Sequence, residues 1–62
     1  IVDTLVKMAG DADAEVRAYA LMGLTYDLGL TDQIRPLLEA HLVDPDEKIR
    51  EHARNVLDGT WT

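Results

Sequence analysis

The chain has 62 residues, of which 47% are hydrophobic, so it suffices for one small domain and is too short for two independent cores. Its 12 acidic and 6 basic residues give a net charge of −6, which argues against a nucleic-acid binder and against attraction to an anionic membrane surface. It has no cysteine for a disulfide or a thiolate zinc site, no apolar run of about 20 residues, and no visible signal peptide, which indicates a cytoplasmic module.

Apolar residues recur at helical spacing in four stretches, and no sustained alternation predicts a strand. The predicted helices cover residues 1–9, 14–28, 32–43 and 46–58, and glycines predict the ends of the first, second and fourth at Gly10, Gly29 and Gly59. The buried faces are expected to carry, in chain order, Ile1, Leu5, Met8, Ala9, Val16, Ala20, Gly23, Leu24, Leu28, Ile34, Leu37, Leu38, Leu42, Ile49, Ala53, Val56 and Leu57.

Acidic residues predict where the helices begin. The stretch Asp44-Pro45-Asp46-Glu47 predicts a cap, a proline at the first helical position, where a missing N–H is harmless, and two carboxylates in the first turn. Residues 11–15 predict the same start without the proline. The third helix is expected to open after Thr31 or Asp32 as its cap, with Pro36 costing one backbone hydrogen bond inside it.

A shift of 33 residues lays 11–24 over 44–57 and predicts an internal repeat. Two amphipathic helices matched by chance would share apolar positions but seldom the acidic pair and the arginine as well. The aligned pairs are Asp11 with Asp44, Asp13 with Asp46, Val16 with Ile49, Arg17 with Arg50, Ala20 with Ala53 and Leu24 with Leu57. The spacing also allows an ion pair between Asp13 and Arg17 and between Asp46 and Arg50, each four residues apart.

The pattern D-x-D-x-x-V/I-R-x-x-A, followed by I-R-P-L-L-E-A-H-L-V-D-P-D, resembles HEAT repeats, closest to the short HEAT-like repeats named after phycobilisome bilin lyases. The resemblance implies antiparallel helix pairs, A then B, stacked as an α-solenoid. The chain would be a single module over 1–62, running from one B helix to the A helix of the next repeat. A start at Ile1 and not at Met suggests a fragment of a longer solenoid. The repeat is slightly longer than is usual, and the extra residues fall in 24–28.

The resemblance further implies a polar ladder between neighbouring repeats. In such a ladder an arginine is held by carboxylates and carbonyls, which makes its role structural. Its members here would be Asp13, Arg17, Asp46 and Arg50.

The sequence predicts no catalytic, metal or cofactor site. There is no serine, no cysteine and no Gly-rich phosphate loop. Asp11-x-Asp13-x-Glu15 resembles the start of a calcium loop, but Val16 and Met22 stand where that loop needs Gly and Glu. His41 and His52 are not in a zinc-binding spacing. We therefore expect no enzyme and no cofactor.

The expected function is a non-catalytic protein-interaction or scaffolding module. In the family the B helices line the concave side, so the resemblance implies contact with another protein through Asp3, Lys7, Gln33, Arg35 and Glu39. The alternatives are a fragment of a HEAT-like enzyme such as a bilin lyase, or a purely structural segment of a solenoid.

Two further expectations concern apolar surface. The first helix lacks its own A partner and is rich in apolar residues, which predicts a homodimer through that helix, or else only marginal stability. Tyr19 and Tyr26 are expected to pad the outer face of the second helix, with Trp61 folded back over the end of the stack.

Overall fold

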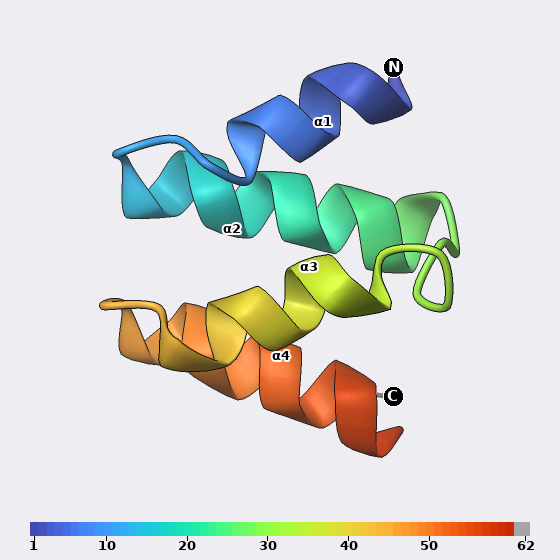
Figure 1. Ribbon diagram of the computed structural model, residues 1–62, viewed down its shortest axis with the longest axis vertical. Helices are drawn as coiled ribbons and strands as arrows, with labels where there is room; N and C mark the ends of the chain where they lie inside the picture. Colours follow the sequence, from blue (N-terminus) through green and yellow to red (C-terminus); the bar gives the residue numbers. More distant parts are fainter. Residues whose placement is uncertain (61–62) are drawn as a thin grey trace. The chain divides into compact units, whose positions relative to one another are not determined.

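The computed structural model describes residues 1–60, and this part of the chain is all-helical, with four α-helices and no strand (Figure 1). The helices are α1 (Val2–Met8), α2 (Ala14–Met22), α3 (Arg35–Ala40) and α4 (Glu47–Asp58). A π-helical segment, Gly23–Asp27, continues α2, and a 3₁₀ turn, His41–Val43, continues α3. The expected position of Trp61 lies outside the described residues.

The chain divides into two compact units. Unit 1 spans Ile1–Leu30 and holds α1, α2 and the π-helical segment; unit 2 begins at Thr31 and holds α3, the 3₁₀ turn and α4. Within each unit the two α-helices run antiparallel and pack against each other, joined by a short loop (Figure 1). Each unit is therefore a helical hairpin.

An aspartate caps the N-terminus of α2 and of α4, although in α4 it is not the aspartate that was expected. Asp13 and Asp46 are the N-caps, with extended backbones, and their carboxylates accept the backbone N–H of Glu15 and Ile49 respectively. The prediction of Asp44 as the cap, with Pro45 in the first helical position, is wrong, because Asp46 takes that role and Pro45 precedes it. Either aspartate can cap a helix, so residue type did not distinguish them.

The start of α3 also differs from the prediction. Residues 31–34 form a turn, and α3 begins at Arg35 after Ile34, which makes no side-chain cap bond. Pro36 therefore stands in the first turn, where no N–H needs an intrahelical partner, and the expected loss of a backbone hydrogen bond does not occur.

Two of the three glycines that were predicted to end helices have a left-handed backbone. Gly59 ends α4 with φ of 76°, and Gly29 follows the π-helical segment with φ of 64°. Both conformations suit glycine, which has no Cβ to clash. Gly10 lies just past α1 as expected, but the residue that caps the end of α1 is Ala9, which has a right-handed backbone.

Eight of the nine buried hydrophobic residues among those described were predicted, and Leu21 was missed. They are Ala9, Ala20, Leu21, Leu24, Ile34, Leu38, Ile49, Ala53 and Val56. Ile1, Leu28 and Leu42 were expected in the core and are exposed, Ile1 to 88%. Ile1 precedes α1, Leu42 lies in the 3₁₀ turn, and Leu28 follows the π-helical segment, so none of them keeps the 3.6-residue phase of its helix.

In the described part of the chain, no helix combines the length and the apolar character that crossing a bilayer requires.

Candidate functional site

The loop between α1 and α2 is held by one aspartate and one arginine. The carboxylate of Asp11 accepts the backbone N–H of Asp13 at 2.8 Å. The Arg17 guanidinium reaches back and donates, through Nη1, to the carbonyl oxygens of Asp11 and Ala12, both at 2.9 Å. These bonds tie the first turn of α2 to the loop that precedes it.

Unit 2 repeats this arrangement 33 residues later. The Asp44 carboxylate accepts the N–H of Asp46 at 2.8 Å, and Arg50 Nη1 donates to the carbonyls of Asp44 at 2.7 Å and Pro45 at 3.0 Å. We call each arginine with its two accepting carbonyls a carbonyl clasp. Because the donors and acceptors correspond residue by residue, the repeat seen in the sequence is also a repeat of local structure.

The arginines of the two clasps do not form the ion pairs that the four-residue spacing allowed. Neither Asp13 with Arg17 nor Asp46 with Arg50 makes a salt bridge within the described residues. The cap carboxylates instead accept backbone N–H groups, and the guanidinium groups donate to carbonyls. The ladder between repeats stays a prediction.

All five residues predicted to bind a partner are exposed. Asp3 and Lys7 lie one turn apart on α1, and Arg35 and Glu39 lie one turn apart on α3. Gln33 is not on the third helix as expected, because it falls in the turn before α3. An exposed ion pair of 3.3 Å joins Arg35 Nη2 to Asp32, and such pairs contribute at most about 1 kcal/mol.

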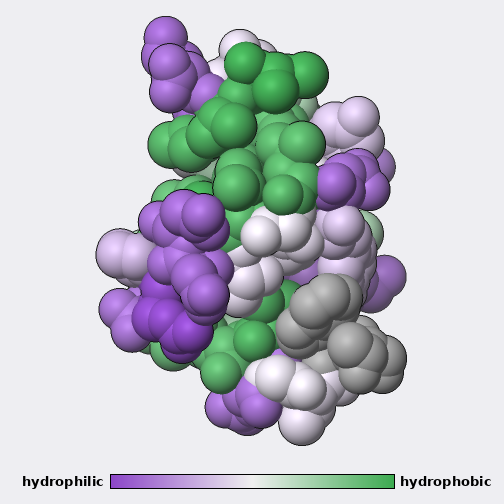
Figure 2. Space-filling view, turned by 90° about the vertical axis from the view of Figure 1, so that its right-hand side faces the viewer, coloured by the Kyte–Doolittle hydropathy of each residue, from purple (hydrophilic) through white to green (hydrophobic). Residues whose placement is uncertain are grey.

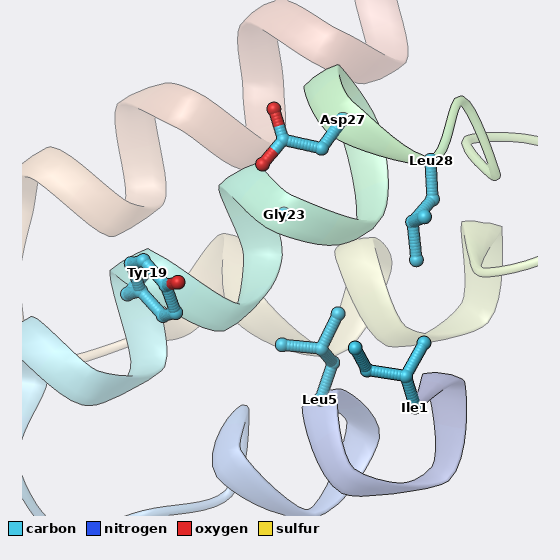
Figure 3. A pocket seen from close by; sticks show the side chains of 6 residues that line it. All are labelled: Ile1, Leu5, Tyr19, Gly23, Asp27 and Leu28. Atoms are coloured by element: carbon cyan, nitrogen blue, oxygen red, sulfur yellow. The ribbon is translucent and has the colours of Figure 1, made fainter.

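Unit 1 also contains a pocket that sequence reasoning missed. Its volume is about 170 Å³, and its lining residues are Ile1, Leu5, Tyr19, Gly23, Asp27 and Leu28 (Figure 3). The side chains of Ile1 and Leu5 point toward that of Leu28, while Tyr19 and Asp27 border Gly23 on its other sides. Figure 2 shows hydrophobic side chains gathered on the part of this face that belongs to unit 1. The only sequence signal was the group of extra residues at 24–28.

The histidines lie in different environments. His41 Nδ1 lies 2.8 Å from the carbonyl oxygen of Leu37, one turn earlier. His52 is half-buried on α4, and burial lowers its pKa from the ordinary value of 6.5 because the charged form loses hydration. Among the described residues, no three histidine or carboxylate side chains are grouped so that they could hold a metal ion.

Comparisons of the chain with models of protein families, with curated proteins and with solved structures found no match.

Proposed function

We propose that the chain is a HEAT-like repeat module that binds another protein and carries out no chemistry of its own. The observation that carries this proposal is the recurrence of the carbonyl clasp. Arg17 and Arg50 lie at equivalent positions of two helical hairpins and donate to equivalent pairs of loop carbonyls. Recurrence of one supersecondary unit at a fixed period is typical of repeat proteins.

The proposed assembly is an α-solenoid, in which neighbouring hairpins stack and bury a continuous apolar core. A single hairpin of this size cannot bury its apolar face alone, which is the physical reason that such units occur in series. Solenoids present extended concave surfaces, which repeat proteins use for binding.

The proposed contact residues support a protein partner. Asp3, Lys7, Gln33, Arg35 and Glu39 are all exposed, and they bring two carboxylates, two cations and an amide. Alternating charge favours an equally mixed partner surface over a polyanion, which would be repelled by the overall charge of −6.

Site-specific photocrosslinking tests the proposal. A photoreactive amino acid at Glu39, on α3, should give a discrete crosslinked product with the partner in extracts of the source cell. The matched position is Glu51, which is also exposed but lies on α4, an expected A helix. Product from Glu39 and none from Glu51 supports the proposal. No product from either would favour a segment whose only role is structural, and equal labelling from both would refute contact through α3 in particular.

A further inference from the structure

The pocket of unit 1 has an apolar wall that water covers in the isolated chain. Ile1, Leu5 and Leu28 form this wall, and Figure 3 shows the Leu28 side chain directed toward Ile1 and Leu5. Ile1 is 88% exposed and Leu28 is 41% exposed. An exposed apolar surface next to a hollow is typical of an interaction site.

The opposite side of the pocket is polar and has unused hydrogen-bonding capacity. Tyr19 and Asp27 are both exposed, and neither side chain has a hydrogen-bond or ion-pair partner among the described residues. Gly23 lies between the two sides, and because it has no side chain, the Leu5 methyl groups approach its backbone so closely that a Cβ there would lie 3.5 Å from one of them. The pocket thus joins an apolar wall to one carboxylate that has no ion-pair partner among the described residues.

The π-helical segment creates this arrangement. The N–H of Leu28 bonds to the carbonyl of Gly23 at 3.0 Å, a span of five residues in place of four. The extra residue advances Asp27 and Leu28 around the helix, away from the face that a continuous α-helix would give them. Single π-helical turns are rare and are frequently found at functional sites.

The size and the charge of the pocket select its occupant. A volume of about 170 Å³ is well below the roughly 300–1,000 Å³ of a small-molecule site and suits one amino-acid side chain. Unit 1 has five acidic and two basic side chains, and one of those two, Arg17, is already bound to loop carbonyls. A second copy of the chain would bring another acidic surface to Asp27, whereas a basic segment would be attracted.

We propose that the pocket receives one lysine or arginine side chain from a basic segment of the protein partner. The aliphatic stem packs along Ile1, Leu5 and Leu28, and the cation lies beside the Asp27 carboxylate and the Tyr19 ring. Long basic side chains bind in this way, with the stem on apolar surface and the charge on a carboxylate or an aromatic face. This inference rests on the proposed function, since it assumes a protein partner.

An NMR titration of the isotope-labelled chain tests the pocket directly. The probes are three capped pentapeptides with glycine on both sides of a central lysine, arginine or norleucine. We expect the lysine and arginine peptides to shift the amide signals of residues 23–28 and of Leu5, and to bind more tightly than the norleucine peptide. Equal binding of the norleucine peptide, or shifts elsewhere only, would overturn the proposal.

Two variants locate the charge and the cavity. Asp27→Asn should weaken binding of the lysine peptide about two- to fivefold, the range measured for exposed ion pairs, while Glu51→Gln removes the same charge from α4 and should leave binding unchanged. Gly23→Ala would place a methyl group 3.5 Å from Leu5, an ordinary contact, so the chain should fold while the pocket becomes smaller. It should weaken binding of all three peptides. Unchanged affinity in Asp27→Asn would refute the role of that carboxylate.

The outcomes separate this inference from the proposed function. If Glu39 crosslinks the partner while the three peptides leave the pocket signals unmoved, the module binds protein through α3 and the pocket has no part in it. If the pocket signals change on dilution without peptide, a second copy of the chain occupies the site, which would overturn the assignment to a basic segment.

Discussion

Replacing Arg50 by alanine removes one complete carbonyl clasp and leaves the rest of α4 intact. The guanidinium makes two hydrogen bonds, at 2.7 Å to the carbonyl of Asp44 and at 3.0 Å to that of Pro45. Hydrogen bonds to charged groups each contribute roughly 1.5–3 kcal/mol when they are well sheltered. Here one bond is part-buried and the other is exposed, and water can satisfy the freed carbonyls in part. We therefore expect Arg50→Ala to lower the free energy of unfolding by about 1–3 kcal/mol.

The matched control lies on the same helix. Arg54 is exposed and has no hydrogen-bond partner among the described residues, so Arg54→Ala makes the same change of charge and of helix propensity without breaking a clasp. Its stability should change by less than about 0.5 kcal/mol. Arg50→Lys should fall between the two, because the shorter, compact ammonium cannot match the reach of the planar guanidinium.

Urea unfolding followed by far-UV circular dichroism measures the difference, and thermal melting gives a second reading. In a domain of this size, a loss of 1 kcal/mol lowers the melting temperature by roughly 4–8 °C. The repeat predicts that Arg17→Ala is destabilising too, through the equivalent bonds to Asp11 and Ala12. A midpoint for Arg50→Ala equal to that of Arg54→Ala would show that the clasp does not stabilise the fold.

Three further changes probe other features of the chain. Gly59→Ala should cost about 1–2 kcal/mol, because φ of 76° is strained for a residue with a Cβ, whereas Gly10→Ala should be nearly neutral; urea midpoints compare them. Burial lowers the pKa of His52, so the unfolded chain binds the proton more tightly, and the free energy of unfolding should fall as the pH drops from above 6.5 through the lowered value. His52→Gln should make the free energy of unfolding depend less on pH, and an unchanged slope against pH would contradict this role of His52. The predicted dimer would use Val2 and Val6, which are 38% and 41% exposed on α1 and do not line the pocket. In sedimentation at tens of micromolar, the parent chain should be a dimer and Val6→Lys should be a monomer. A parent chain that is already a stable monomer would refute the predicted dimer.

Short-range patterns were enough to predict the helices, most of the core and the repeat. Residues such as Ala20, Leu38 and Ile49 are buried as their 3.6-residue spacing predicts. Gly29 and Gly59 have the left-handed backbone expected of glycine at a helix end. The match of Arg17 with Arg50 predicted two equivalent local structures. These features depend on contacts between residues only a few positions apart, which a sequence displays directly.

The choice between chemically equal candidates was not visible in the sequence. Asp44 and Asp46 can both cap a helix, and which one does so depends on where the backbone first turns, with Asp44 instead holding the loop. Each arginine likewise had a carboxylate and two carbonyls within reach. The carboxylate accepts a backbone N–H at the cap, and the guanidinium donates to the carbonyls. Sequence spacing shows which partners are possible, and the competition for the same hydrogen bonds decides among them.

Only the tertiary structure showed the pocket. It requires the π-helical turn, which shifts the helical phase by one residue and brings Leu28 and Asp27 to positions that a 3.6-residue period assigns elsewhere. It also requires α1 to pack against α2, so that Leu5 meets Gly23 across 18 positions of the chain. The sequence marked the first only by the extra residues at 24–28. A pattern of local preferences does not contain the second, because this contact joins residues of two different elements.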